Sequence, residues 1–536
     1  MNDRLSLRWL GLASLALGLA MIIVDATIVN VAIPSIIADL GLQLTDAEWV
    51  NTVYSLVFAA LLVTVGRFGD LYGRKRIYLL GLAAFVAASL LAASAPTGSL
   101  LIAARALQGI GAAMILPSTL SSVNAMFRGR ERAIAFGIWG SVIGGMAALG
   151  PLVGGWLTTS YSWRWAFYIN LPIGLVAGTV ALLTVPETRD TQAARGLDPI
   201  GIVTSALGFA ALVFGLIEGE RYGWWQPTDT FRIGTWEWPL SSLSPVPLAL
   251  ALATLLLPLF TAYELRRVRL ERPVLLDLRL FRYRSFRWGN LAALIVSLGE
   301  FGIVFVLPLY LQAVLGYTAF QTGQVLIAVA LGAFLGGPAA ANLAQRFGAR
   351  QVVRAGMLLE AAGLLLLVPV LAPDTHGWRL APALFIYGLG VGLATAQLTS
   401  VILAEVPTAQ SGQASGTQST TRQVGAALGI AILGTVLAAT LASGTEARLM
   451  ERLGFPADQA AMLARATKQS AGQILVQLRA QPGSEAMVRA IEDAFTDAAR
   501  RTALVAAAFI GIGFIASWLI PDIRPGEEPS PGTVPR

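Results

Sequence analysis

The sequence contains no cysteine and one histidine, and only 13% of its 536 residues are charged. The lack of cysteine excludes disulfides, thiolate catalysis and cysteine-ligated metals. The histidine, His376, lies beside Asp374 and Gly377 in a predicted loop, and one imidazole forms neither a zinc site nor a catalytic dyad. We therefore predict that the protein is not an enzyme, with no catalytic residue, no bound metal and no cofactor.

Charge is too scarce for an ordinary soluble protein, in which about a quarter of the residues are charged. Apolar residues make up 55% of the chain, and its mean hydropathy is +0.67. The net charge of +7 comes almost entirely from arginines between apolar runs. Such a distribution reflects membrane topology, so we expect no nucleic-acid partner. Lysine occurs only as Lys75 and Lys468, which is typical of a GC-rich bacterial genome.

Long apolar runs predict an all-α integral membrane protein with fourteen transmembrane helices. The first run is too long for a cleaved signal peptide, so we interpret it as an uncleaved span. The predicted spans are 9–33, 48–66, 77–95, 99–124, 133–158, 165–185, 200–218, 246–263, 287–312, 322–343, 352–372, 380–403, 423–443 and 503–520.

Arginine and lysine gather in alternate short loops, above all in the second, fourth and eighth, whereas the first, third and ninth contain none. Because positive loops stay in the cytoplasm, both termini are predicted to be cytoplasmic. Two predicted outer loops are long: 221–245 carries four tryptophans, which favour the membrane interface, and 443–501 has the spacing of a helical hairpin. We expect this hairpin to be a packed cap, and a role in gating or partner binding is the alternative. The Pro- and Glu-rich tail is expected to be disordered.

An internal repeat organises the spans. Its matches, 275 to 279 residues apart, are Asp25–Val31 with Glu300–Val306, Gly73 with Gly348, Gln108–Gly111 with Tyr387–Gly390, and Ala147–Gly150 with Ala426–Gly429. The repeated unit contains six helices, and the offset leaves room for two more. We therefore predict four regions: a six-helix bundle over 1–190, two additional helices over 191–270, a second six-helix bundle over 271–520, and a tail over 521–536. Transporters with parallel halves have this arrangement, with a cavity between the halves.

Four motifs occur in order along the first half, at Asp25–Pro34, Gly66–Arg76, Arg105–Gly111 and Gly144–Gly155. Together they resemble the major facilitator superfamily, and specifically its fourteen-helix drug:proton antiporter branch. The stretch Gly66–Arg76 resembles the signature loop between helices 2 and 3, and Asp25–Pro34 is similar to the first-helix motif of that branch. Arg105–Gly111 resembles the fourth-helix motif, and Gly144–Gly155 resembles the fifth-helix antiporter motif, which is associated with export. In the second half the pattern departs, because Gln345 replaces the acid matching Asp70. The resemblance implies the major facilitator fold and a multidrug exporter.

Charged residues inside the predicted spans are few, and each is a functional candidate because burying an ion in a bilayer is costly. Asp25 and Arg105 are placed roughly 13 and 9 Å below the same surface, so they can meet. A carboxylate whose pairing with an arginine changes with conformation can couple proton uptake to movement, whereas a permanent structural pair is the alternative. Glu300 occupies the position in the second half that matches Asp25. Glu360 is a weaker candidate for proton coupling than Asp25 and Glu300. The proton-coupling candidates are Asp25, Arg105, Glu300 and Glu360.

The position of Asp70 near Arg74 and Arg76 predicts ion pairs that form when the cytoplasmic ends of the two halves approach each other. Gly150-Pro151 predicts a kink or a hinge in the fifth helix. The predicted conformational-switch residues are Gly66, Arg67, Asp70, Gly73, Arg74, Arg76, Gly150 and Pro151.

Polar and aromatic residues on helices expected to face the cavity are the candidates for substrate contact. They are Asn30, Tyr54, Gln108, Phe301, Phe305, Tyr387 and Gln397. Aromatic walls with one or two carboxylates suit lipophilic, often cationic molecules. Neutral or amphiphilic compounds, including lipids, are the alternative substrates.

These observations predict a proton-driven, monomeric multidrug exporter in a bacterial cytoplasmic membrane. Its partners would be a small lipophilic substrate, protons and membrane lipids. A transporter of a specific lipid or metabolite, a proton-coupled importer, and a receptor or scaffold that does not transport are the alternatives.

Overall fold

The computed structural model describes residues 2–42, 44–190, 196, 198–233, 236–239, 243–470, 472 and 474–522. Most of the tail predicted to be disordered, 523–536, lies outside the described residues. Within the described ranges the chain is almost entirely helical. Its one sheet there is a two-stranded antiparallel ribbon of β1 (Arg232–Ile233) and β2 (Trp236–Glu237).

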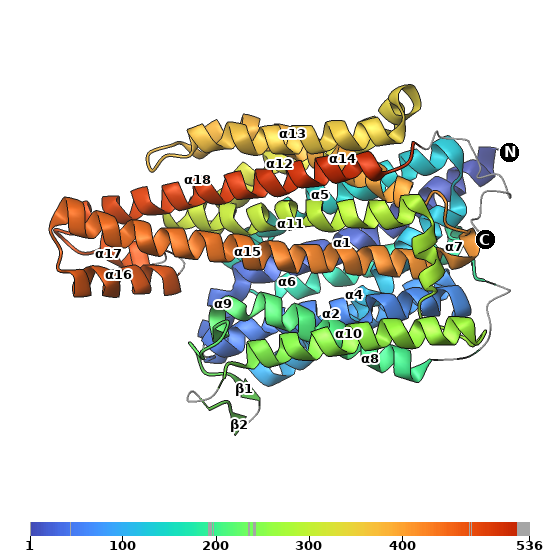
Figure 1. The fold of residues 1–536 in the computed structure, drawn as a ribbon, viewed down its shortest axis with the longest axis horizontal. Helices are drawn as coiled ribbons and strands as arrows, with labels where there is room; N and C mark the ends of the chain where they lie inside the picture. Colours follow the sequence, from blue (N-terminus) through green and yellow to red (C-terminus); the bar gives the residue numbers. More distant parts are fainter. Residues whose placement is uncertain are drawn as a thin grey trace.

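The helices alternate in direction along the long axis of the molecule (Figure 1). Those up to the ribbon are α1 (Asn2–Leu40), α2 (Leu44–Tyr72), α3 (Arg74–Ala93), α4 (Gly98–Met126), α5 (Gly129–Ser160), α6 (Trp165–Tyr168), α7 (Asn170–Thr184), α8 (Pro199–Ile217) and α9 (Gly219–Tyr222). Those after it are α10 (Pro245–Arg269), α11 (Arg284–Ala313), α12 (Ala319–Phe347), α13 (Ala349–Val370), α14 (Ala381–Ile402), α15 (Ser411–Leu453), α16 (Ala457–Gln469), α17 (Ile474–Arg479) and α18 (Glu485–Ala516). Short 3-10 turns are η1 (Leu278–Arg282), η2 (Gly377–Leu380), η3 (Thr408–Gln410) and η4 (Ser517–Leu519).

Among the described residues, thirteen helical segments are long and apolar enough to cross a membrane. They coincide with thirteen of the fourteen predicted spans. The remaining predicted span, 133–158, coincides with α5, a helix of 32 residues, or about 48 Å at 1.5 Å per residue. The prediction of an all-helical membrane fold is therefore confirmed. The sixth span combines α6 and α7, which meet at Ile169.

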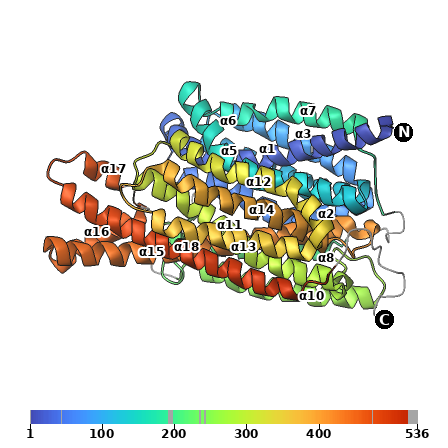
Figure 2. The ribbon, with the colours of Figure 1, turned by 90° about the horizontal axis from the view of Figure 1, so that it is seen from above.

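The two ends of the bundle differ. α1 begins and α18 ends at the same end, here called the terminus end, whereas α16 and α17 project beyond the other end, called the cap end (Figure 1). Figure 2 shows α3 and α7 on one side of the bundle and α10 and α18 on the other. α5 packs on α12, and α2 packs on α15, so these helices join the first half to the second.

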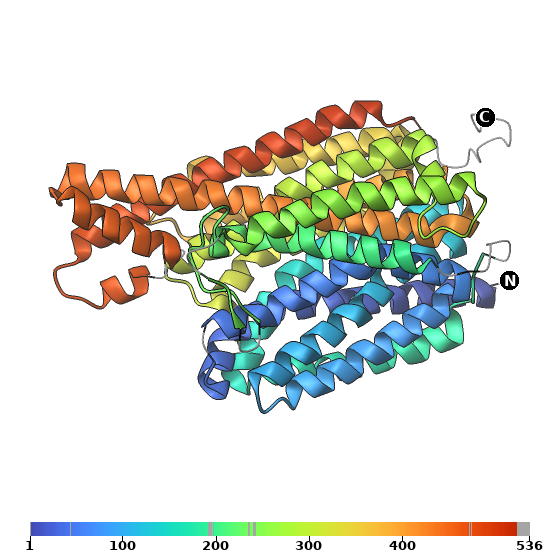
Figure 3. The ribbon, with the colours of Figure 1, turned by 60° about the horizontal axis from the view of Figure 1, so that its bottom comes forward.

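The additional pair α8 and α10 packs together and lies against the seam between the halves (Figure 3). α8 contacts α2 of the first half and α15 of the second, whereas α10 presents a row of exposed leucines that includes Leu248, Leu252 and Leu255. Such an apolar outer face is what a helix surrounded by lipid requires. The pair therefore touches both halves without entering either bundle.

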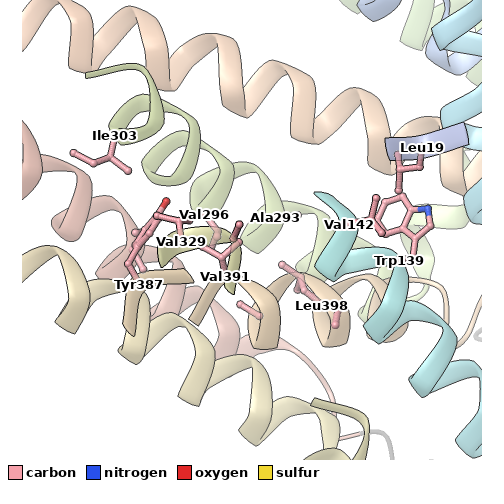
Figure 4. Packing of buried hydrophobic residues seen from close by; sticks show 14 of the residues in the cluster. Leu19, Trp139, Val142, Ala293, Val296, Ile303, Val329, Tyr387, Val391 and Leu398 are labelled. Atoms are coloured by element: carbon pink, nitrogen blue, oxygen red, sulfur yellow. The ribbon is translucent and has the colours of Figure 1, made fainter. Parts of the chain in front are cut away.

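Glycine permits the closest approaches between the halves. A Cβ at Gly137 would lie 2.4 Å from the carbonyl oxygen of Gly337, and one at Gly155 would lie 3.1 Å from the backbone of Phe320. These two contacts lie near opposite ends of the α5–α12 pairing. Between them one apolar cluster continues from Trp139 in the first half to Leu398 in the second (Figure 4). Close backbone packing and a shared apolar cluster thus join the two halves.

Matched turns support the internal repeat. Gly73 precedes α3 with φ 111°, and Gly348 precedes α13 with φ 86°. Both angles lie in the region that glycine tolerates and other residues avoid. The same conformation therefore recurs at the positions that the sequence pairs.

The segment predicted as an outer hairpin is built largely by extending two spans. α15 continues to Leu453, α18 begins at Glu485, and α16 and α17 lie between them. Ion pairs from Arg448 to Asp497 and from Arg452 to Asp493 join the two extensions. The aromatic loop before α10 packs on itself, since Phe231 contacts Tyr222 and Trp238.

Candidate functional site

Asp25 lies at the centre of a fully buried polar network in the first half. Nη1 of Arg105 donates to its Oδ2 at 2.5 Å. Nε2 of Gln108 and Nδ2 of Asn170 donate to its Oδ1 at 3.0 and 2.7 Å. The same two amides also donate to Oγ of Ser89. The network ties α1, α3, α4 and α7 together, and none of these side chains is more than 1% exposed.

The guanidinium of Arg105 is held from several sides. Its Nε donates to the carbonyl oxygen of Val50 at 3.0 Å, and its Cζ lies 4.2 Å from the centre of the Tyr54 ring. The Tyr54 hydroxyl donates to the carbonyl oxygen of Ile22. Nη2 of Arg105 has no hydrogen-bond partner among the described residues. One donor of this buried cation therefore stays available when the network is closed.

Two members of this network were absent from the sequence prediction. Ser89 and Asn170 are ordinary polar residues in apolar spans. Asn170 contacts Asp25 directly and Ser89 joins through the two amides, so both positions depend on how α3 and α7 pack. The sequence signal that could have found Asn170 is the rarity of amides inside membrane helices, because a buried amide needs partners.

The carboxylate of Glu300 has a different kind of partner. Nη2 of Arg422 donates to its Oε2 at 3.1 Å, and the Thr395 hydroxyl donates to its Oε1 at 3.3 Å. The hydroxyl of Tyr387 donates to its backbone oxygen. The repeat pairs Arg105 with Leu384, which carries no charge. Arg422 reaches Glu300 from α15 instead, at a position that the sequence analysis placed just before a span.

Glu360 is fully buried, and neither of its carboxyl oxygens has a hydrogen-bond partner among the described residues. Its side chain packs beside Gly390 of α14, where a Cβ would lie 2.8 Å from the Glu360 Cγ. Arg422 thus pairs with Glu300, whereas Glu360 has no hydrogen-bond partner among the described residues. Glu360 lies inside the bundle and not at its periphery.

The candidates for substrate contact separate into groups. Tyr54 and Gln108 belong to the Asp25 network, and Tyr387 contacts Glu300. Gln397 is 1% exposed, and its Nε2 has no partner among the described residues. Phe301 is half-buried, and Phe305 is 42% exposed. The side chain of Asn30 lies outside the described part of the structure.

At the terminus end, Asp70 binds the start of α15 across the halves. Its carboxylate accepts hydrogen bonds from the backbone N–H groups of Gly412 and Gln413 at 2.8 and 2.9 Å. Arg74 donates to Asp70 at 2.7 Å and to the carbonyl oxygen of Thr408 at 2.7 Å. We call these contacts the latch. A carboxylate is a favourable partner for the free N–H groups at a helix start.

Glycine lets the latch close. A Cβ at Gly66 would lie 2.4 Å from the carbonyl oxygen of Gly412. Arg67 is buried, and its Nε has no partner among the described residues. Arg76 does not reach Asp70: its Nε lies 3.7 Å from Glu187, whose carboxylate also accepts from the N–H groups of residues 75 and 76 at the start of α3. A pocket of 640 Å³ opens beside the latch between Arg74, Glu187 and Thr408.

The fifth-helix motif lies beside Asp25. A Cβ at Gly150 would lie 1.7 Å from Oγ1 of Thr27, and one at Gly154 would contact Ile28. Pro151 lies inside α5, whose helix continues unbroken to Ser160. The motif therefore brings α5 against the turn of α1 that follows Asp25.

Comparisons with known proteins agree with this architecture. The model of the Major Facilitator Superfamily matches residues 15–430. The chain is a member of the Major Facilitator Superfamily. Several of its relatives are named as antibiotic resistance or multidrug efflux proteins. The puromycin resistance protein pur8 of Streptomyces alboniger is 35% identical, over 80% of this chain and 82% of its own. The multidrug efflux pump LfrA of Mycolicibacterium smegmatis is 32% identical, over 94% of this chain and 96% of its own.

A solved superfamily structure shares the fold. The human organic anion transporter MFSD10 matches with a TM-score of 0.55 at 13% identity, over 96% of this chain and 98% of that one. At this identity the likeness concerns the fold alone. The relatives place the chain in the drug-efflux branch of the superfamily, as a multi-pass membrane transporter.

Proposed function

We propose that this transporter exports lipophilic, cationic or amphiphilic compounds from the cytoplasm or the inner leaflet in exchange for protons. The observation that carries the proposal is the Asp25 network, in which one carboxylate with no access to solvent contacts a guanidinium and two amides from two other helices. Protonation of Asp25 would remove the ionic part of this contact. Such a site responds to a proton by loosening the helices it joins.

We expect the neighbouring contacts to transmit this loosening from the first half to the second. Asp25 is two residues before Thr27, against which Gly150 of α5 packs, and α5 is the main partner of α12 in the second half. A shift of α1 would therefore change the contact between the halves. The opposite end is held by the latch. We propose that the halves rock between these two sets of contacts.

The substrate class rests on the second half and on the relatives. Glu300 and Glu360 provide more acid than Arg422 neutralises, and Tyr387 adds an aromatic wall. Such a site attracts lipophilic cations. The relatives named for puromycin resistance and multidrug efflux support a drug-like substrate. A specific lipid or metabolite, or import, is the alternative.

The placement in the membrane follows from the arginine-rich loops at the terminus end. We propose that this end faces the cytoplasm of a bacterial cell, that the cap end faces outward, and that the protein works as a monomer surrounded by lipid.

The decisive experiment measures uptake of a fluorescent lipophilic cation into inside-out vesicles under an imposed pH gradient. Wild type is compared with Asp25→Asn and Arg105→Ala. Uptake that requires the gradient and is lost with Asp25→Asn supports proton exchange at this site.

Uptake that persists unchanged in folded Asp25→Asn contradicts coupling at Asp25. If folded wild type does not accumulate the cation, but a neutral drug or a lipid is transported, the cationic substrate class is wrong.

A further inference from the structure

The pair α8 and α10 carries a second buried acid site, far in sequence from Asp25. Asp198, which precedes α8, and Glu264, near the end of α10, each direct one carboxyl oxygen to the same place beside Gly201. Oε1 of Glu264 and Oδ2 of Asp198 lie 2.5 and 2.6 Å from one point, the position that a Cβ at Gly201 would take. The two residues are 0% and 4% exposed. Two carboxylates buried this close together repel each other, and a proton on one of them removes the repulsion.

Neither of these two oxygens accepts a hydrogen bond from another described residue. The nearest cation is Arg267, whose Nε lies 3.4 Å from Oδ2 of Asp198 and donates to the carbonyl oxygen of Pro273. The hydroxyl of Tyr263 accepts from the same guanidinium. One guanidinium therefore faces two buried acids, and a shared proton completes the site.

The other carboxyl oxygens of Asp198 and Glu264 accept hydrogen bonds from backbone N–H groups. Oδ1 of Asp198 accepts from the N–H of Gly201 and caps α8. Oε2 of Glu264 accepts from the N–H groups of Leu275 and Leu276 at 3.1 and 3.4 Å. The segment between α10 and η1 is thus fixed by the side chain that shares the proton.

This segment continues directly into the latch. The next N–H, that of Asp277, donates to Oε1 of Gln413 at 2.8 Å. The N–H of Gln413 donates to Asp70 at 2.9 Å. The carboxylate of Asp277 also pairs with Arg279 at 2.7 Å and faces Gln410. These hydrogen bonds, linked through the backbone of residues 275–277 and through Gln413, therefore connect the acid pair to the contact between the halves.

We propose that Asp198 and Glu264 bind one shared proton from the solvent at the terminus end, and that losing this proton loosens the latch. With the proton present, Glu264 is held against Asp198 and keeps residues 275–277 in place. Without it, two buried negative charges face each other and repel. Glu264 then moves away and its hold on Leu275 and Leu276 weakens. The site goes beyond the exchange proposed above, because it sets how readily the transporter opens and does not drive it.

The absence of cysteine makes the test direct. Tyr72, which ends α2, and Ala409, in η3, lie exposed on either side of the latch. Spin labels on Tyr72→Cys and Ala409→Cys report its opening by pulsed electron resonance in lipid nanodiscs. The distance is followed from about pH 5 to about pH 9, a range that covers shared carboxyl protons. All measurements carry Asp25→Asn, so that proton binding at Asp25 does not contribute.

In the reference protein, we expect the population with the longer distance to grow as the pH rises. Glu264→Gln should lose this change and keep the short distance throughout, because the amide donates to Asp198 without needing a proton. Glu271→Gln removes an exposed carboxylate from the segment that follows α10 and serves as the matched control, with the response of the reference protein. Asp198→Asn can still cap α8 and should also lose the pH-dependent change in distance. It replaces Glu264→Gln in the test if that variant does not fold.

A reference protein that does not respond to pH overturns the proposal. It is also overturned if Glu264→Gln and Asp198→Asn, both folded, titrate like the control, or if Na⁺ at constant pH produces the change instead. Since none of these measurements involves a substrate or a gradient, failure here and failure of proton-driven export are distinguishable.

Discussion

The two halves of the molecule repeat the same helices but balance buried charge differently. In the first half, Asp25 has a guanidinium and two amides as partners, all fully buried. In the second half, Glu300 pairs with Arg422, whereas both oxygens of Glu360 lack hydrogen-bond partners among the described residues. A saturated carboxylate is stable until a proton arrives. An acid without partners is costly when ionised and is ready to bind a proton or a cation.

The comparison shows that the repeat preserves backbone geometry and not chemistry. Gly73 and Gly348 adopt the same conformation, whereas the residue that matches Asp70 is Gln345, which donates to the carbonyl oxygen of Ala341 in its own helix. The latch therefore exists once. Close helix packing tolerates few substitutions, but a buried charge can be moved to another helix if a partner is found there.

The largest difference between the halves should appear in transport. Asp25→Asn removes the only carboxylate of the first-half network, so gradient-driven uptake should fall at least about tenfold. Glu300→Gln should reduce uptake less, because Glu360 stays nearby. Initial rates in inside-out vesicles, normalised to the amount of folded protein, measure both. Equal losses would mean that the halves contribute alike.

Stability should separate the two arginines. Arg105→Ala leaves Asp25 buried without its cation and should cost about 3–5 kcal/mol. Arg422→Ala breaks a single hydrogen bond at 3.1 Å to Glu300 and should cost about 1–3 kcal/mol. Thermal unfolding midpoints in detergent rank the variants. The reverse order would show that Arg422 is the stronger structural partner.

The single latch should make the halves unequal at the terminus end. Asp70→Asn weakens the hold on Gly412 and Gln413 by about 1–3 kcal/mol, so opening should become about 5–150-fold more frequent. Gln345→Ala removes a bond within one helix and should change little. Maleimide labelling of a cysteine placed at Ser411, which is fully buried, reports opening as a rate. Similar rates in the two variants would argue against the latch.

The smallest effect concerns the contacts that tie α9 to each half. Glu218, which accepts from Thr52 of α2 at 2.6 Å, has its pKa raised by burial. Burial also acts on Glu220, but hydrogen bonds from Thr435 and Trp224 and the charge of Lys468 outweigh it and lower the pKa of Glu220. The contact of Glu220 with the second half therefore contributes stability above its ordinary pKa of 4.5 and loses it as the pH falls further. The contact of Glu218 should weaken in the opposite direction, as the pH rises.

Glu220→Gln should accordingly lower the unfolding midpoint by about 1–2 °C at neutral pH and leave it unchanged near pH 3, since the difference is carried by the ionised form. An equal loss at both pH values would mean that the contact does not depend on charge.

The membrane fold could be predicted from the sequence because long apolar runs have few other stable structures in a chain of this composition. Asp25 and Arg105 could be paired by depth alone. Asn170 and Ser89 could not, since their contact depends on the rotation of α3 and α7. Arg422 was missed for another reason. Residues 411–422 are rich in Ser, Thr and Gln and do not look like a span, yet they are helical and belong to α15, which packs on α2 and α4, and Gln418 donates to Thr399 of α14.

The length of α15 has a pharmacological consequence. This helix runs without interruption for 43 residues, about 65 Å at 1.5 Å per residue, from Gly412 in the latch to Arg452 in the cap. In the orientation proposed here, one end faces the cytoplasm and the other stands outside the cell. An antibody fragment that clamps α15 to α18 at the cap would restrain the far end of the same rigid rod. An inhibitor that acts at the cap would therefore not need to cross the cell membrane.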